Sequence, residues 1–351
     1  MSQYRVSQAT IGGPNRPSIV ERIPTVRRGR FIDHSNSGSE TPDMSLLLTT
    51  SKFSRSVRWS LVVKRLPSDR DNHRKPCYSP HLGPTSRNTS LLRINQSLKS
   101  LGVRTYGPSS SLKVQQLPCG MYLKTMHRDD YQTLVNEFGA LKLVRSQNKV
   151  PVPRPLDLVS DSDASDLLTT TTPGQRLGSY IDTLGDDDLD IFRHDMQKYM
   201  AQLRSVSRQG EQKHAISNAV GGPCYDYRTV ACQDYDEERG DFFGPFTDEE
   251  EFNDTLRTPA LPDAFHSTGH GIVFTHSDIN MRNVLIHNGR ISGIVDWENS
   301  GWFPDYWEYT KAHYVTKLNM RWLAVVDRIF ESLGNFKLEL AIERRLWDYC
   351  F

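Results

Sequence analysis

The sequence predicts an α+β protein in which a few short strands precede a mainly helical region. Two strand-like stretches in "SLKVQQLPCGMYLKTM" are separated by Pro118 and Gly120. The next segment, "DDYQTLVNEFGALKLVRSQ", has apolar residues at helical spacing. Toward the C-terminus, "PDYWEYTKAHYVTKLNMRWLAVVDRIFESL" is expected to be mostly helix. The fold class rests on these three observations.

Residues 1–100 are a basic extension, rich in Ser and Arg, that we expect to be disordered. Residues 1–110 hold 18 Lys and Arg but 6 Asp and Glu, a balance of +12, and the other residues carry 25 against 36, a balance of −11. The short apolar runs of the extension cannot offset the entropy lost on ordering. Its charge suits a nucleic-acid or membrane contact as well as a solvated tail, but no aromatic residues are interleaved for stacking on bases. We therefore expect neither a nucleic-acid nor a membrane partner.

Ordered structure is expected to begin near Leu112. The second of the two strands should end at Lys124, and the helix after it carries Glu137 near its middle. The prolines of "VPVPRPLDLV" require an extended chain, and the β-branched "DLLTTTTPGQRL" predicts a strand that stops at its Pro-Gly pair. The segment "DDDLDIFRHDMQKYMAQLRSV" then predicts a long amphipathic helix.

Loops dominate residues 210–270, with one short helix expected over residues 248–257. A strand over residues 271–275 enters a polar loop, and the hairpin "VLIHNGRISGIVDW" follows. Asn288 and Gly289 suit the two-residue type I′ turn of this hairpin, because both tolerate positive φ angles.

The five cysteines show neither metal-type spacing nor a CxxC pair, so they do not suggest a disulfide framework. No apolar run approaches the roughly 18 residues that a spanning helix needs, and the first residues lack the apolar core of a secretory signal. We therefore expect a reducing compartment, the cytoplasm.

Four polar residues surround the predicted hairpin: His276, Asp278, Asn283 and Asp296. An antiparallel hairpin returns the chain to its start, so Asn283 and Asp296 should lie near each other. Oxygen ligands of this kind suit Mg²⁺, and Asp278 would be free to accept a proton from an attacking hydroxyl. Each residue alone is more readily explained as a loop or turn former, but the four together, at the spacing that the hairpin fixes, favour a functional site.

The segment "HSDINMRN", followed by an Asp-Trp pair, resembles the catalytic segment HxDxxxxN of the aminoglycoside phosphotransferase and choline kinase family. Further stretches, "GGPCYDYR", "FGPF", "EEEFND" and "GWFPDYWEYTKAH", are similar to the fungal branch of that family. The resemblance extends from Leu112 to the C-terminus. It implies a two-lobed, protein-kinase-like fold, with an N-terminal lobe over residues 101–172 that holds a small antiparallel sheet, and a larger, mainly helical catalytic lobe over residues 173–351.

The resemblance also implies the role of each site residue. Asp278 would be the catalytic base and His276 a residue that positions its loop. The cofactors would be ATP and Mg²⁺, with Asn283 and Asp296 as the metal ligands. At the other side of the cleft, Lys124 would bind the ATP phosphates, Glu137 would orient Lys124, and "LLTTTTPGQ" would be the hinge that receives adenine.

The chain departs from the family pattern at two places. Ser277 and Ile279 stand where relatives usually show Gly and Leu, and no GxGxxG loop precedes Lys124; "YGPSSSLKV" takes its place. The phosphate-covering element is therefore the least defined part of the expected site.

The expected reaction is transfer of the γ-phosphate of ATP to a hydroxyl of a small molecule, such as an aminoglycoside, choline or a similar amino alcohol. No activation segment follows Asp296 to dock a protein substrate, and the acidic balance suits a cationic acceptor. Two other readings stay open: an inactive kinase-like nucleotide-binding or interaction protein, and a metal-dependent hydrolase with the same Asp and Asn ligands. The sequence does not define the oligomeric state.

Overall fold

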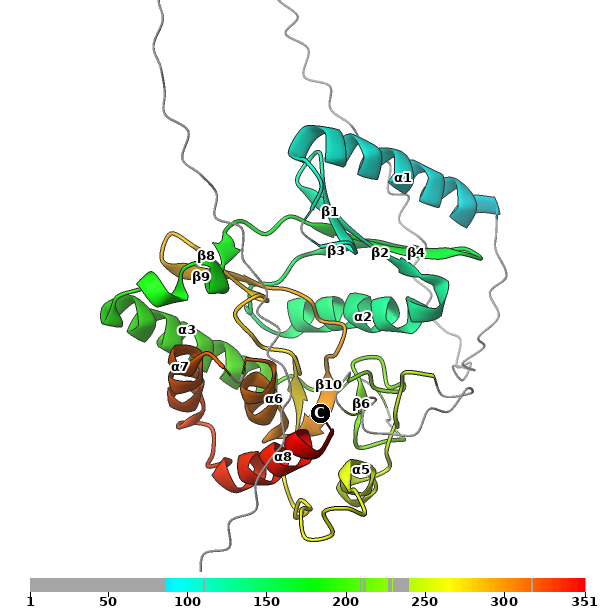
Figure 1. Cartoon of the computed structure of the whole chain (residues 1–351). Helices are drawn as coiled ribbons and strands as arrows, with labels where there is room; N and C mark the ends of the chain where they lie inside the picture. The colour runs from blue at the N-terminus through cyan, green and yellow to red at the C-terminus, as the bar shows by residue number, and fades with distance from the viewer. Residues whose placement is uncertain are drawn as a thin grey trace, which may run out of the picture. The chain divides into compact units, whose positions relative to one another are not determined.

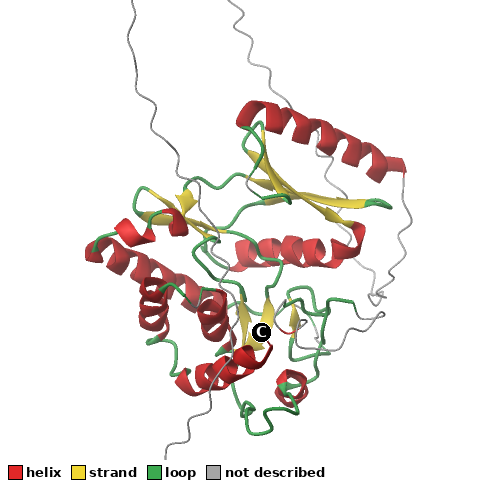
Figure 2. Ribbon diagram, viewed as in Figure 1, coloured by secondary structure: helices red, strands yellow, loops and turns green. Residues whose placement is uncertain are grey.

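The computed structural model of the chain describes two lobes, one built on a small sheet and one mainly helical (Figure 2). The expected two-lobed α+β arrangement is thereby confirmed. The expectation for residues 1–85 lies outside the described part of the chain. The structure describes residues 86–109, 111–208, 210, 213–226, 229, 240–316 and 318–350.

The smaller lobe is a four-stranded antiparallel sheet of order β1-β2-β4-β3. Helix α2 covers one face of this sheet and helix α1 lies across the other (Figure 1). Met126, Leu134 and Leu167 form the buried core between α2 and the sheet. The elements are α1 (Ser86–Tyr106), β1 (Val114–Leu117), β2 (Met121–His127), α2 (Tyr131–Gln147), β3 (Pro155–Ser160) and β4 (Ala164–Thr170).

Helix α1 corrects the expectation that residues up to 100 are disordered and that order begins near Leu112. The helix buries Leu92, which is 4% exposed, and the Asn95 side chain donates to Asp166 Oδ2 over 3.1 Å. Ile94 and Leu101 stay about half exposed, so the apolar residues do not form the single stripe by which amphipathic helices are found in a sequence. Strand β2 also continues to His127, beyond its expected end at Lys124.

The larger lobe holds most of the helices and two small sheets, of order β5-β8-β9 and β6-β10-β7. Its core is a single cluster rich in aromatic side chains, among them the fully buried Trp297, Trp307 and Trp322. Strands β6 and β10 were not expected from the sequence. The elements are β5 (Gln175–Arg176), α3 (Asp186–Arg204), β6 (Ser217–Asn218), α5 (Glu249–Leu256), β7 (Ile272–Thr275), β8 (Val284–His287), β9 (Arg290–Ile294), β10 (Gly301–Pro304), α6 (Trp307–Val315), α7 (Met320–Phe330) and α8 (Lys337–Cys350).

Strand β4 ends at Thr170, and the chain then crosses into the larger lobe, where β5 pairs with β8. Short 3-10 turns over Leu177–Ser179 and Ile181–Thr183 lead from β5 to α3. Within the described part of the chain, no helix combines the length and the apolar character needed to span a membrane.

Candidate active site

A cavity of about 720 Å³ is lined by residues of both lobes. Strand β2 contributes Lys124 and α2 contributes Glu137, while the larger lobe contributes Asp278, Asn283 and Asp296. The structure therefore brings five of the six predicted site residues to one cavity. The sixth, His276, is completely buried behind it.

Lys124 is held by three carboxylates. Its Nζ lies 2.8 Å from Glu137 Oε2, 2.6 Å from Asp296 Oδ1 and 2.7 Å from an oxygen of Glu298. Burial alone lowers the pKa of Lys124, but the surrounding carboxylates outweigh it and raise the pKa well above its ordinary value. Lys124 is therefore a fixed positive charge at the junction of the two lobes.

The hairpin forms as expected and brings two of the predicted oxygen ligands, Asn283 and Asp296, close together. Asn288 and Gly289 have φ angles of 51° and 72°, as a type I′ turn requires. Strands β8 and β9 pair through Val284 and Ile294, and the Val295 N–H donates to the Asn283 carbonyl over 2.9 Å. Asn283 thus lies beside the residue that precedes Asp296, whose side chain is 40% exposed and lines the cavity.

The Asp278 carboxylate is oriented by two side-chain amides. Asn283 Nδ2 donates to Asp278 Oδ2 over 2.8 Å, and Asn280 Nδ2 donates to Asp278 Oδ1 over 3.1 Å. Burial, reinforced by the charge of Asp296, raises the pKa of Asp278 to about 7. A carboxylate whose pKa is raised in this way is a stronger proton acceptor than an exposed carboxylate.

His276 anchors the loop from beneath. Its Nε2 donates to the Val295 carbonyl over 3.0 Å, and its Nδ1 accepts the Asp278 N–H over 3.2 Å. Burial lowers the pKa of His276 to about 4, so the ring is neutral near pH 7. The contacts make His276 a link between the Asp278 loop and the strand that leads to Asp296.

A second anchor, Glu308, comes from the start of α6 and was not predicted. Its buried carboxylate accepts the backbone N–H groups of the loop residues His276, Ser277 and Ile279 over 2.5, 3.0 and 3.4 Å. Ser277 has a φ angle of 65°, a left-handed conformation that glycine adopts most easily. The contacts with Glu308 therefore hold a non-glycine residue in a conformation that glycine adopts more easily.

The donor chemistry of the site fits a hard divalent cation. One carboxylate oxygen each from Glu137, Asp296 and Glu298 lie within 4.8 Å of one another. Because Asn283 Nδ2 is bonded to Asp278, its Oδ1 is the atom left for a cation. Carboxylate and amide oxygens are ligands that Mg²⁺ accepts.

Glu298 was also missed from the sequence, although it lies only two residues after Asp296. That spacing is the one signal that could have found it. For Glu308 the sequence offers no comparable signal, because its contact with the loop spans about thirty residues.

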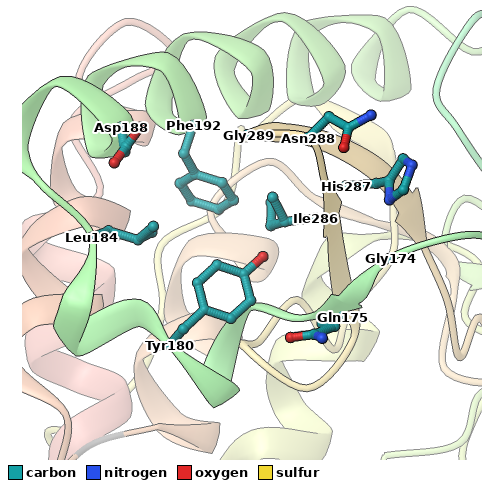
Figure 3. A pocket seen from close by; sticks show the side chains of 10 residues that line it. All are labelled: Gly174, Gln175, Tyr180, Leu184, Asp188, Phe192, Ile286, His287, Asn288 and Gly289. Carbon is teal, nitrogen blue, oxygen red and sulfur yellow. The ribbon is translucent and has the colours of Figure 1, made fainter.

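A smaller cavity of about 470 Å³, shown in Figure 3, shares the lining residues Gly174 and Gln175 with the first. The side chains of Tyr180, Phe192 and Ile286 point toward one another around it. Leu285 of β8 lines the larger cavity, whereas Ile286 and His287 line the smaller one. None of the six predicted site residues lines the smaller cavity.

Comparisons with known proteins agree with the residue pattern. The sequence profile of the phosphotransferase enzyme family matches residues 112–335. None of the curated proteins matches the chain significantly.

Solved structures similar to this chain are aminoglycoside phosphotransferases of low sequence identity. APH(4)-Ia has 12% identity and a TM-score of 0.43, over 76% of this chain and 98% of that protein. The aminoglycoside-3'-phosphotransferase of type VIII has 17% identity and a TM-score of 0.48, over 74% and 99%. APH(3'')-Id from Streptomyces rimosus, in complex with ADP and streptomycin, has 12% identity and a TM-score of 0.49, over 76% and 100%.

Proposed function

The chain belongs to the phosphotransferase enzyme family, and from this premise we propose that it transfers the γ-phosphate of ATP to a hydroxyl group of a small molecule. One observation carries the proposal. A fixed lysine from the smaller lobe and the polar residues of the Asp278 loop and the hairpin line a single cavity.

ATP would bind with its phosphates at Lys124, which Glu137 orients through the 2.8 Å ion pair. Asn283 and Asp296 of the larger lobe would hold Mg²⁺. When bound, Mg²⁺ would neutralise charge on the phosphate oxygens. The protein's own contribution is to fix these charges in advance, because phosphoryl transfer depends on positioning and electrostatic stabilisation.

Asp278 would act as the base. Its carboxylate takes the proton of the acceptor hydroxyl as the acceptor oxygen bonds to the γ-phosphorus, and the bond from that phosphorus to the bridging oxygen breaks to release ADP. The amides of Asn280 and Asn283 hold the carboxylate in place for this step. His276 would keep the loop in register through its two backbone contacts.

The acceptor would be an aminoglycoside, choline or a similar amino alcohol. Residues 297–300 alone separate Asp296 from β10, which leaves no activation segment on which a protein substrate could dock. The acidic balance of residues 111–351, −11, suits a cationic acceptor. The cysteine spacing of the sequence, which does not suggest disulfides, supports a cytoplasmic location for this reaction.

The proposal is tested on the full chain by thermal unfolding with ATP plus Mg²⁺, with ATP plus a chelator, and with Mg²⁺ alone. A ligand at a hundred times its dissociation constant adds about 2.7 kcal/mol, or roughly 5–10 °C in a domain of this size. We expect this shift only when ATP and Mg²⁺ are both present.

Turnover is then measured as ADP release with a panel of aminoglycosides and amino alcohols, for the native chain and for Asp278→Asn. Loss of the base should reduce the rate by roughly 10²- to 10⁴-fold while the melting shift is kept. A shift without turnover on any acceptor would favour the inactive nucleotide-binding protein. Turnover that needs metal but not ATP would favour the hydrolase.

A further inference from the structure

The side chain of Asn136 joins three segments that are distant in sequence. Its Nδ2 donates to the carbonyl groups of Glu298 and Ser300, both over 2.8 Å. Its Oδ1 accepts the Ala219 N–H over 2.8 Å. Asn136 is 3% exposed, and its amide makes three hydrogen bonds in a buried position where an unmade bond is costly.

These contacts stand directly beside the charged cluster. Asn136 directly precedes Glu137 in α2. Glu137 contacts Lys124, and Asn136 contacts the chain that follows Asp296. The Trp297 N–H also lies 3.4 Å from Glu137 Oε1. The segment that carries Asp296 and Glu298 is thus fastened to α2 at successive positions.

Ala219, whose N–H donates to Asn136, belongs to a turn over residues 218–222 that has its own hydrogen bonds. Asn218 Oδ1 accepts the N–H groups of Val220 and Gly222 over 3.0 and 2.8 Å, which closes the turn after β6. Helix α2 approaches this turn closely, because a Cβ added at Gly139 would lie 2.2 Å from Val220 Cγ1. Asn136 and Gly139 are three residues apart and therefore share one face of α2. Figure 1 shows α2 between its sheet and strands β6 and β10.

We propose that Asn136 is a positioning residue that holds the backbone of Glu298 and Ser300, and so places the Asp296 and Glu298 carboxylates for the metal–nucleotide complex. The inference rests on the proposed function. Without the amide, the Glu298 carbonyl loses a buried donor and the segment can move away from Lys124. The helix that carries Glu137 would lose its contact with the Ala219 turn at the same time.

The test is calorimetric titration of Mg²⁺ into the full chain with saturating ATP, for the native protein and for Asn136→Ala. Residues that hold metal ligands in place typically change metal affinity by about 10- to 100-fold when removed. We expect the Mg²⁺ dissociation constant to rise by this factor, while the affinity for ATP in a chelator changes by less than about threefold. The metal titration is independent of turnover and needs no acceptor.

Asn253→Ala is the matched control. Asn253 is also buried, at 2% exposed, and its Nδ2 donates to the Ser267 carbonyl over 3.0 Å; neither residue lines the cavity that holds the site residues. This variant should lower the melting temperature without changing the Mg²⁺ affinity. If Asn136→Ala does not fold, Asn136→Ser retains a hydroxyl in the buried position and is expected to show the same loss of Mg²⁺ affinity.

Two negative results are distinguishable. If the native chain binds Mg²⁺ with ATP and a folded Asn136 variant binds it equally well, Asn136 is structural only and the positioning role is overturned. If the native chain shows no Mg²⁺-dependent ATP binding, it is the proposed function that fails.

Discussion

Lys124 and Asp296 lie 172 positions apart in the sequence, yet Lys124 Nζ donates to Asp296 Oδ1 over 2.6 Å. Lys124 belongs to the small sheet and Asp296 follows the hairpin of the larger lobe. The pair therefore joins the lobes at the point where we propose that phosphate binds. Glu137 and Glu298 complete the cluster, so carboxylates outnumber the lysine three to one.

Removal of the lysine charge should destabilise the fold until a cation replaces it. In Lys124→Met three neighbouring carboxylates lose their partner, which should lower the free energy of unfolding by about 3–5 kcal/mol. Mg²⁺ should restore more stability to this variant than to the native chain, as measured by urea unfolding with and without the ion. The control is Lys142→Met on the exposed side of α2, which loses only a cation–π contact with Phe138 and should change the stability by less than about 1 kcal/mol. Equal stability of Lys124→Met and the native chain without Mg²⁺ would contradict the assignment.

Glu308 should affect turnover more than nucleotide binding. Glu308→Ala leaves up to three loop N–H groups without their acceptor, and we expect a loss of about 2–5 kcal/mol in stability. Because the loop carries Asp278, the turnover number should fall at least about tenfold, with the affinity for ATP retained. Glu308→Gln keeps one acceptor oxygen and should be milder in both measurements. Glu308 is not an anchor of the loop if the rate per folded molecule stays at the native value.

The burial of His276 predicts an acid-sensitive contribution to stability. Its folded pKa of about 4 lies below the ordinary 6.5, so the unfolded chain binds more protons between these values and stability falls as the pH drops from 6.5 to 4. The contribution is about 3 kcal/mol over that range. Urea unfolding at several pH values should show a steeper loss for the native chain than for His276→Gln, which keeps a side-chain N–H donor. Parallel pH profiles for the two proteins would argue against a neutral buried imidazole.

Local chemistry explains which parts of the site could be predicted from the sequence. The hairpin was predictable because the Asn288–Gly289 turn fixes its register, and the register brings Asn283 next to the residue before Asp296. The ion pair of Lys124 and Glu137 was implied by the family resemblance, and the order of a strand followed by a helix supported it. Each of these relations follows from a short stretch of chain.

The residues that were missed depend on contacts between distant segments. Asn136 is buried because α2 is packed between the sheet and the larger lobe, and its amide bonds segments that are far away in the sequence. Glu308 meets the Asp278 loop only after β7 and α6 have packed together in the larger lobe. Helix α1 was missed for the same reason, since its few buried residues find their partners in the sheet.

The turn of the hairpin gives a clean test of backbone conformation. Gly289 has a φ angle of 72°, and a Cβ added there would meet no atom within 4 Å. Gly289→Ala should therefore lower the unfolding free energy by about 1–2 kcal/mol through backbone strain alone. Asn tolerates the left-handed conformation, so Gly289→Asn should cost less when both are measured by urea unfolding. The reverse order of the two variants would rule out a type I′ turn.

Two neighbouring residues of α1 test whether this helix is part of the fold. Leu92 is 4% exposed and Ile94 is 54% exposed, so side chains of similar size differ in burial. Leu92→Ala should lower the unfolding free energy by about 2–4 kcal/mol, and Ile94→Ala should change it by less than about 0.5 kcal/mol. Urea unfolding of the full chain measures both. A small effect of both substitutions would mean that α1 does not pack on the sheet in solution, because a helix that covers the sheet must lose apolar burial when Leu92 is truncated.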